Sequence, residues 1–325
     1  MDVRPPVIDP HAIAAEAFGP GTRVTSSVRL PGGASRETWA LDVSGPDGDR
    51  HELVLRLDSP GAALQAEIGG GLAAEARLMR AAADAGVPVP GIVASGASYL
   101  LMTRVPGETI PRRILRDDAY AAARPLLAAQ CGRALAAVHR MPLSCAPREE
   151  QEDPLLRWRD LLDQLGEPHP VFELALRRLA ADRPPGSRMT VVHGDFRNGN
   201  LIVGPEGIRA VLDWELAHAG DPLEDLGWLC VKSWRFGSPL PVGGFGHYDD
   251  LVDAYERAGG APVDREALRW WETFGVLKWG VICVMQTMRH LRGGARSVEL
   301  AAIGRRVCKN EWDLLQMLRE RTAGG

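Results

Sequence analysis

The sequence predicts an α+β protein of two lobes, a small β-rich N-terminal lobe and a larger helical C-terminal lobe. Strand patterns separated by glycine turns fill most of the first hundred residues, whereas helical patterns dominate after Gly107. A polar loop also stands between two short apolar strand patterns inside the helical part. We place the boundary in a hinge at residues 103–107, so that the lobes comprise residues 1–103 and 104–325.

The N-terminal lobe begins with three strand patterns, over residues 23–30, 37–45 and 50–58. The turns "PGGAS" and "GPDGD" separate them, as is typical of β-hairpins. An amphipathic helix is expected over residues 71–86, because Gly86 and the nearby Pro88 are helix-terminating residues. Residues 91–105 then predict two short strands joined by a turn.

Six helical patterns make up most of the C-terminal lobe, at about 118–140, 153–165, 170–182, 247–259, 264–292 and 296–321. Two strand-like pieces interrupt them, "MTVVHGD" with "NLIVG", and "IRAVLDW". The segment with the most membrane-like composition is "FGVLKWGVICVM". It is too short to span a bilayer and contains Lys278, so we expect a core helix instead.

Composition narrows the possible partners of the protein. The chain has 325 residues, a formal net charge of -4, 45% apolar and 25% charged residues, which is typical of soluble globular proteins. It has no basic surface that would suggest nucleic acid. Its five cysteines are widely spaced and form no C-x-x-C pair, which predicts buried free thiols in a reducing compartment. The start lacks the features of a signal peptide, so we expect a cytoplasmic protein that does not bind membranes.

One loop carries the strongest candidates for chemistry. Asp195 and Asn200 lie in "HGDFRNGN", and Asp213 follows the apolar run "AVL". If "NLIV" and "AVLDW" pair as a hairpin, these three side chains converge at one end of it. A carboxylate with a carbonyl oxygen suits Mg²⁺, and a second carboxylate could accept a proton from an alcohol. The alternative is that each residue is an ordinary turn former.

Several other enzyme classes lack their motifs in this sequence. There is no G-K dipeptide for a P-loop, no G-x-S-x-G elbow and no G-x-G-x-x-G after a strand. A hydrolase that uses Asp195 and Asp213 as paired carboxylates is a further alternative. It would leave Asn200, Arg56 and Glu75 without a role.

The spacing H-x-D-x-x-x-x-N, with a later Asp after an apolar strand, resembles the catalytic loop and the metal-binding Asp of protein kinases. With "HGD" and the run "VVHGDFRNGNLIVGPEGIRAVLDWELAHAGDPLEDLGWL", the chain more closely resembles the aminoglycoside phosphotransferase and choline kinase group of small-molecule kinases. It is similar to the branch that is fused to acyl-CoA dehydrogenases in animals. The resemblance extends over the whole chain. It implies a protein-kinase-like fold, ATP and Mg²⁺ as cofactors, and a small-molecule hydroxyl as phosphate acceptor.

The resemblance also implies roles for individual residues. The expected metal ligands are Asn200, Asp213 and Glu215, although Glu215 could contact substrate instead. Asp195 would be the catalytic base that orients the substrate hydroxyl. Arg197 would neutralise the transferring phosphoryl group, or else be a solvated surface arginine. His193 would brace the loop, and Asp225 would tie it to a helix.

The resemblance places the nucleotide against the N-terminal lobe. "PGGASRET" would cover the phosphates with backbone N–H groups at Gly33 and the hydroxyl of Ser35. Kinases usually present a lysine from the third strand, but no lysine precedes Lys232. Arg56, which stands alone between leucines, would therefore hold phosphate with Glu75 as its partner. The adenine would bond to the backbone of the hinge, at Met102, Thr103 and Arg104.

The phosphate acceptor is less constrained. Residues 226–300 contain eight acids and nine bases, a balance that does not suit a polycationic antibiotic. Five tryptophans also lie there: Trp228, Trp234, Trp270, Trp271 and Trp279. They either belong to the helix core or partly line an acyl pocket. With the family branch, this favours a hydroxyacyl compound or hydroxyacyl-CoA. The alternatives are an aminoglycoside, another amino-alcohol or sugar, and a non-catalytic nucleotide-binding pseudokinase.

Overall fold

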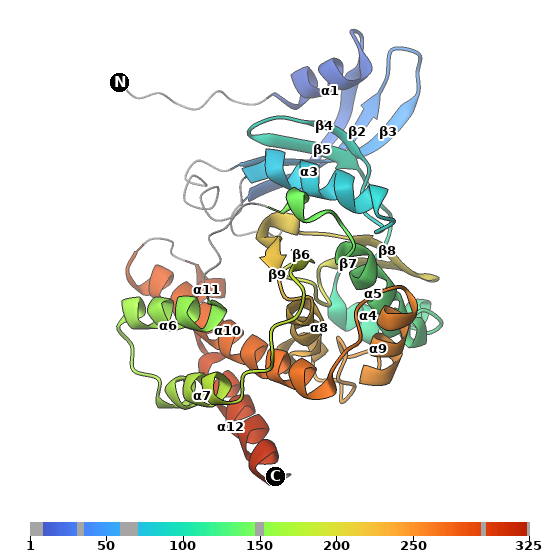
Figure 1. The fold of residues 1–325 in the computed structure, drawn as a ribbon. Helices are drawn as coiled ribbons and strands as arrows, with labels where there is room; N and C mark the ends of the chain where they lie inside the picture. The colour runs from blue at the N-terminus through green and yellow to red at the C-terminus, as the bar shows by residue number, and fades with distance from the viewer. Residues whose placement is uncertain (1–8, 31–35, 59–70, 147–152, 294–296, 324–325) are drawn as a thin grey trace.

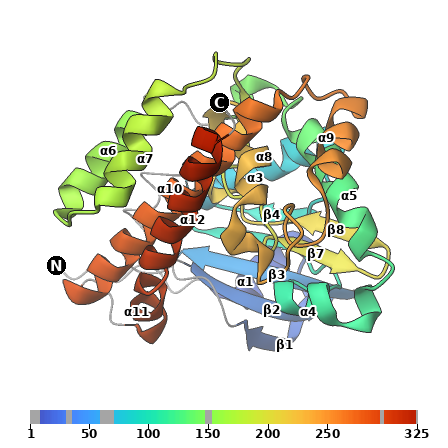
Figure 2. The ribbon, with the colours of Figure 1, turned by 90° about the horizontal axis from the view of Figure 1, so that it is seen from below.

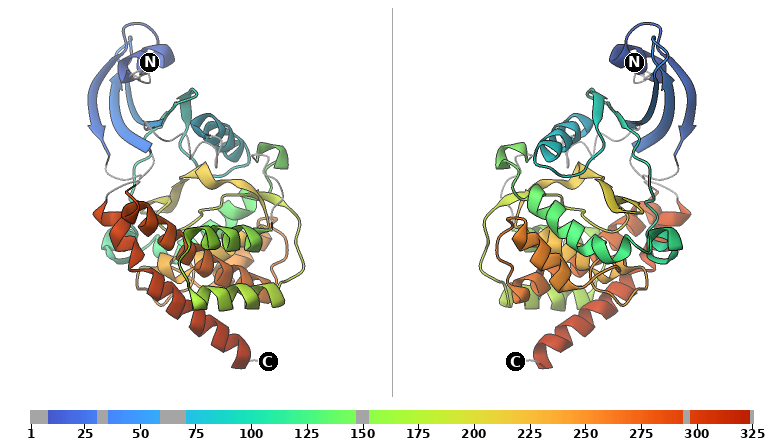
Figure 3. Two further views of the ribbon diagram at one scale, coloured as in Figure 1. Left: turned by 90° about the vertical axis from the view of Figure 1, so that its left-hand side faces the viewer. Right: turned by 90° about the vertical axis from the view of Figure 1, so that its right-hand side faces the viewer.

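The structure, a computed structural model, describes residues 9–30, 36–58, 71–146, 153–293 and 297–323. The predicted α+β class and the two lobes are confirmed. A curved sheet with two helices forms the upper lobe in Figure 1, and a larger, mainly helical lobe lies below it. Figure 3 shows the same division from two sides. The boundary after residue 103 stays a prediction.

The N-terminal lobe is built on one antiparallel sheet with the order β1-β2-β3-β5-β4. Its strands are β1 Arg23–Arg29, β2 Arg36–Ser44, β3 Arg50–Asp58, β4 Ile92–Ser95 and β5 Tyr99–Thr103. Two helices pack against the sheet, α1 (Pro10–Phe18) and α3 (Gly71–Asp84). All five strands and α3 were predicted, whereas α1 was not.

Side-chain alternation along β3 determines which residues face the other lobe. Leu53 and Leu55 are buried in the small core that the sheet shares with α1. Because successive residues of a strand point to opposite faces, Val54 and Arg56 point the other way. Val54 packs against the large core of the molecule, which includes α3 and the C-terminal lobe. Arg56 is therefore directed toward α3.

The C-terminal lobe contains helices that pack around the long, buried helix α10. Their bounds are α4 Pro111–Arg116, α5 Arg124–Val138, α6 Pro154–Leu165, α7 Pro170–Ala181, α8 Leu223–Cys230, α9 Tyr248–Arg257, α10 Arg265–Leu291, α11 Val298–Gly304 and α12 Val307–Ala323. Short 3-10 turns lie at η1 Asp118–Tyr120, η2 Leu143–Cys145, η3 Trp214–Leu216 and η4 Lys232–Arg235. Seen from below in Figure 2, α6 and α7 lie side by side on one flank, and α12 runs along α10.

Two short β-ladders carry the polar loop. They pair β6 (Thr190–Val192) with β9 (His218–Gly220) and β7 (Leu201–Gly204) with β8 (Gly207–Val211). The second ladder is the predicted hairpin. Backbone hydrogen bonds tie it to the segment after the hinge, where Glu108 and Val203 exchange two at 2.9 Å, and to the upper lobe, where Val211 N–H donates to Pro88 O at 2.8 Å.

The helical pattern was only partly correct. Helices α4 and α8 and strand β9 were not predicted. The pattern at 118–140 begins with a 3-10 turn, and the pattern at 296–321 is broken at residues 305–306 into α11 and α12. A break of one turn barely disturbs a 3.6-residue periodicity, so the sequence does not reveal it.

The segment "FGVLKWGVICVM" lies in α10 and is largely buried, as expected of a core helix. Among the described helices, none combines the length and apolar content required to cross a bilayer. All five cysteines are free. Cys131, Cys230 and Cys283 are buried as predicted, whereas Cys308 is exposed.

Candidate active site

The loop that follows β6 is held from below by helix α8. One carboxylate oxygen of Asp225 accepts a hydrogen bond from the N–H of His193 at 2.7 Å, and the other accepts from the N–H of Gly194 at 2.9 Å. Asp225 also contacts His139 Nε2 at 3.2 Å. These bonds keep the pKa of this buried carboxyl below its usual value although burial alone would raise it. Asp225 thus ties the loop to a helix, as predicted.

His193 is fully buried and connects the loop to the strand before Asp213. Its Nδ1 accepts a hydrogen bond from the N–H of Asp195 at 3.2 Å, while its Nε2 lies 3.0 Å from Leu212 O. Since a carbonyl can only accept, Nε2 is the donor to Leu212 O. This arrangement supports the bracing role expected of His193.

Asp195 projects from this braced loop with its carboxylate bound by three N–H donors. Its Oδ1 accepts from Trp228 Nε1 at 2.7 Å and from Arg197 Nε at 3.0 Å. Its Oδ2 accepts from Asn200 Nδ2 at 2.6 Å. With 13% of the side chain exposed, Asp195 is fixed in orientation yet reachable.

The hairpin brings Asn200 and Asp213 to the same end, as predicted. Leu201 pairs with Val211, and Leu212 N–H donates to Asn200 O at 2.8 Å. Because Asn200 Nδ2 donates to Asp195, its carbonyl Oδ1 is directed away from that carboxylate. Asp213 has a left-handed backbone with φ 68°, which is unusual for a residue other than glycine and often marks functional sites.

Glu215 follows Asp213 on η3 and is half-buried. Burial, together with the neighbouring carboxylate of Asp213, raises the pKa of Glu215 to about 7. A divalent cation bound beside Glu215 would favour its charged form. In the part of the chain that the structure describes, no group of three or more His, Cys, Asp and Glu side chains surrounds a possible metal position. Two carboxylates and one amide oxygen nevertheless fit Mg²⁺, which retains several waters and substrate phosphates.

The predicted pair of Arg56 and Glu75 forms between β3 and α3. Arg56 Nη1 contacts Glu75 Oε1, and Arg56 Nη2 lies 3.5 Å from Asp213 Oδ1 across the lobes. Glu75 and Asp213 raise the pKa of the Arg56 guanidinium although burial opposes this, so it stays a cation. Glu75 holds a second arginine that the sequence analysis missed, since Arg36 Nη1 lies 2.6 Å from Glu75 Oε2.

Two predicted nucleotide contacts, Gly33 and Ser35, lie outside the described residues. In the hinge segment, the N–H groups of Thr103 and Arg104 are already used, since they donate to Gly91 O at 2.8 Å and Glu52 O at 2.9 Å. The guanidinium of Arg104 binds acids of the neighbouring strands. Met102 is buried within β5. An adenine contact to this segment would therefore involve its carbonyl groups or the next N–H along the chain.

The five tryptophans divide into two groups. Trp270 and Trp271 pack with Phe274 inside the helix core. Trp228 contacts Asp195, and its ring centroid lies 5.3 Å from that of Trp234, against which the guanidinium of Arg197 stacks at 4.7 Å.

Trp279 extends the second group, with its ring centroid 4.8 Å from that of Trp234. Its own indole N–H and that of Trp234 find no hydrogen-bond acceptor among the described residues. All five tryptophans thus belong to the core or pack against it, and the acyl pocket stays a prediction.

A second buried ionic network lies under the loop. Lys278 of α10 contacts Glu224 Oε1 at 3.0 Å, donates toward Gly194 O at 3.3 Å and lies 4.8 Å from the Trp228 ring. His218 faces two acceptors, Leu216 O at 2.9 Å and Glu224 Oε2 at 3.3 Å. Because both ring nitrogens must donate to satisfy them, His218 is an imidazolium. Burial lowers its pKa, but the Glu224 carboxylate outweighs this and raises the pKa of His218 to about 9.

The sequence analysis did not predict the contacts of three residues that hold the loop or share Glu75 with Arg56. Trp228 could have been found, because it lies three residues after Asp225 on one helix and so shares its face. Arg36 directly follows the glycine turn, which was a usable indication. Lys278 was recognised only as a reason against a membrane helix.

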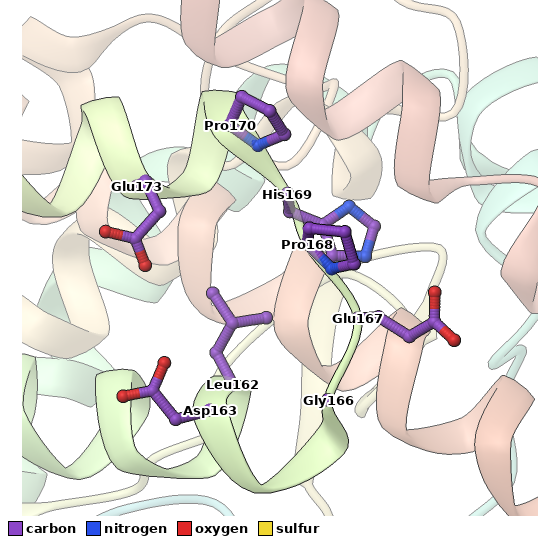
Figure 4. A pocket seen from close by; sticks show the side chains of 8 residues that line it. All are labelled: Leu162, Asp163, Gly166, Glu167, Pro168, His169, Pro170 and Glu173. Carbon is purple, nitrogen blue, oxygen red and sulfur yellow. The ribbon is translucent and has the colours of Figure 1, made fainter.

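A pocket of about 390 Å³ lies elsewhere, at the turn between α6 and α7 (Figure 4). Leu162 and Asp163 line it from α6, and Glu173 lines it from α7. It includes none of the predicted site residues. Its only ionic tie is the contact that the lining residue His169 makes with Glu311 at 3.1 Å, among the contacts of the described residues. This pocket therefore does not coincide with the predicted site.

Comparison with known proteins identifies the family of the chain. The phosphotransferase enzyme family matches residues 27–271, and the chain belongs to that family. It is accordingly a small-molecule kinase. Over 246 residues it is 30% identical to acyl-CoA dehydrogenase family member 10 of Mus musculus. That match covers 68% of this chain but 22% of the mouse protein, so the chain spans about a fifth of that relative's length.

Solved structures confirm the protein-kinase-like fold. A Ralstonia eutropha protein classed with the aminoglycoside phosphotransferases has a TM-score of 0.72 and 22% identity, covering 91% of this chain and 92% of that chain. The ternary complex of APH(2")-IIa with streptomycin and ATP has a TM-score of 0.61 and 15% identity, covering 86% of this chain and 93% of that chain. At these identities the comparison concerns the fold.

Proposed function

We propose that the protein transfers the γ-phosphoryl group of ATP to a hydroxyl of a small acyl compound, with Asp195 as the base. The observation that supports this most strongly is the fixed Asp195 carboxylate, bound by Trp228, Arg197 and Asn200 yet partly exposed. A carboxylate in this position would orient the hydroxyl and accept its proton as the new bond to phosphorus forms.

The nucleotide would lie between the lobes with its phosphates at Arg56. Glu75 is 1% exposed and anchors that guanidinium, so the cation is pre-positioned and its entropy cost on binding is small. Arg197 would face the transferring group from the other side, because its Nε is used by Asp195 while its terminal nitrogens have no ion-pair partner among the described residues. The adenine is expected at residues 102–105.

Mg²⁺ would be held by Asn200 Oδ1, Asp213 and Glu215. When bound there, the metal would neutralise charge on the phosphates. The chain's contribution is the rigid hairpin that sets the spacing of Asn200 and Asp213. The proximity of the Asp213 carboxylate to Glu215, which contributes to the raised pKa of Glu215 after burial, is compatible with this assignment.

A hydroxyacyl compound, including hydroxyacyl-CoA, is the acceptor class that we favour. Two features of the chain support it. Trp228 contacts Asp195 and packs against Trp234, and the cation stacked on Trp234, Arg197, would repel a polycationic antibiotic. The similarity to a member of the acyl-CoA dehydrogenase family points to the same class of compound.

The test is ADP release from Mg-ATP with a panel of hydroxyacyl-CoA compounds, free hydroxy acids, aminoglycosides and amino alcohols. We expect turnover with a hydroxyacyl compound, its loss in Asp195→Asn, and retained ATP binding in that variant. Asp249→Asn, which alters an exposed carboxylate paired with Arg265, is the matched control and should keep full activity.

Turnover of aminoglycosides alone would refute the acceptor class. Near-normal turnover by Asp195→Asn would refute its role as the base. ATP binding without turnover of any compound in the panel would favour the pseudokinase alternative.

A further inference from the structure

Glu75 serves two cations where one was expected. Its Oε1 contacts Arg56, and its Oε2 lies 2.6 Å from Arg36 Nη1. The carboxylate is 1% exposed and the Arg36 side chain 5%, so this arrangement is enclosed. Burying a second guanidinium is costly unless its charge is used. The buried charge of Arg36 therefore suggests that it has a function at this position.

Arg36 spans the cleft between the lobes. Its Nε contacts Asp58 Oδ1 at 3.2 Å within the sheet, and its Nη1 also lies 3.2 Å from Glu215 Oε2 on η3. Arg56 makes the equivalent contact to Asp213. Arg36 thus links Glu75 to Glu215, and Arg56 links Glu75 to Asp213. Glu215 and Asp213 are the two carboxylates that we assign to the metal.

The charge of this cluster is unbalanced. Two guanidinium groups, Arg36 and Arg56, face four carboxylates, those of Asp58, Glu75, Asp213 and Glu215. The contacts to Glu215 at 3.2 Å and to Asp213 at 3.5 Å cross between the lobes, and both are longer than the 2.6 Å contact of Arg36 with Glu75. A cation that binds the η3 carboxylates weakens their hold on the arginines. The freed guanidinium groups then need anionic oxygens, and the arginine fork matches phosphate geometry.

We propose that Arg36 is a second phosphate-binding residue of the nucleotide site, and that it exchanges the Glu215 carboxylate for a phosphate oxygen when Mg-nucleotide binds. This inference rests on the proposed function. It also answers how the site functions without a lysine in the N-terminal lobe: two arginines on one glutamate provide the positive charge. Arg36 begins β2, directly after the glycine turn predicted to cover the phosphates.

Nucleotide binding, measured by titration calorimetry, tests the proposal without relying on turnover. In Arg36→Ala, ADP with Mg²⁺ should bind about 10- to 100-fold more weakly, the loss expected for a hydrogen bond to a charged group. Adenosine, which has no phosphates, should bind as in the wild type. Arg36→Lys keeps the charge but loses the fork and should give an intermediate loss. Arg80→Ala, on the exposed side of α3, is the control and should bind ADP normally.

A double-mutant cycle tests the exchange itself. With EDTA present, Glu215→Gln should tighten binding of metal-free ADP, because the competitor of the phosphate is removed. The same change should have little effect in the Arg36→Ala background.

Unchanged ADP affinity in Arg36→Ala would overturn the proposal, as would an equal loss for adenosine and ADP, which indicates a purely structural role. If Arg36→Ala does not fold, the Arg36→Lys background decides the cycle. Wild-type protein that binds no nucleotide would overturn the proposed function together with this inference. Wild-type binding and turnover with an unaffected Arg36→Ala would overturn the inference alone.

Discussion

Trp228 offers the most direct test of how the catalytic loop is positioned. The substitution Trp228→Phe keeps an aromatic ring against Trp234 and Lys278 but removes the N–H that donates to Asp195 Oδ1 at 2.7 Å. A hydrogen bond to a charged group contributes about 1.5–3 kcal/mol. If the bond is used to orient Asp195 for the transition state, the loss corresponds to a decrease in kcat of about 10- to 100-fold. The KM for ATP should change little, because the bond is remote from Arg56.

The assay is steady-state ADP release for Trp228→Phe beside a matched control, Trp270→Phe. Trp270 is equally buried, and its indole N–H donates to Leu179 O at 2.9 Å inside the helix core. Both variants lose a buried hydrogen bond and ring volume, so both should be destabilised. A normal kcat in Trp228→Phe would refute the positioning role. An equal loss of kcat in Trp270→Phe would assign the effect to general destabilisation.

Three further predictions concern the charges around the loop. Lys278→Met leaves Glu224 buried without its ammonium partner, so the free energy of unfolding, measured in urea, should fall by about 3 kcal/mol or more. Adding Glu224→Gln to the same chain should restore part of this loss. The pKa of His218 is raised to about 9, so its stabilisation is complete below its unfolded pKa of about 6.5 and is lost as pH rises through about 9. Each pKa unit corresponds to about 1.36 kcal/mol, so between pH 6 and 10 the unfolding free energy of the wild type should fall by about 3 kcal/mol more than that of His218→Gln. Parallel plots of unfolding free energy against pH for the two proteins would contradict this. Asp213→Asn should raise the Mg²⁺ concentration needed for half-maximal ATP binding by about tenfold or more, while binding of metal-free ADP at Arg56 is retained.

The part of the site that the sequence predicted correctly is the part that depends on local pairing. Asn200 and Asp213 flank two short apolar runs, and antiparallel pairing of those runs brings the two residues together whatever surrounds them. The contact between Arg56 and Glu75 was also predicted, but from the family resemblance, and strand alternation accounts for the direction of Arg56.

The remaining features depend on packing between distant elements. Arg36 reaches Glu215 only because the sheet and η3 approach each other, and no sequence pattern near either residue predicts that approach. Similarly, composition treats Trp228 and Trp270 as equivalent, although one bonds the predicted base and the other fills the core. Helix α8 was missed for a related reason, since all eight of its residues are buried and it shows no polar face.

A glycine is required in "HGD" because two chain segments cross closely at this point of the site. Gly194 has φ 79°, and a Cβ built on it would lie 2.4 Å from Leu216 O, so no other residue fits without moving η3. Two charged side chains hold the crossing segments: Lys278 donates to Gly194 O, and His218 donates to Leu216 O. Both side chains also bind Glu224. One buried carboxylate thereby sets the spacing between the loop that carries the predicted base and the turn that carries the predicted metal ligands. This is why the chain tolerates two buried cations beneath a site whose substrates are anionic: their charge is balanced locally, and their hydrogen bonds hold backbone.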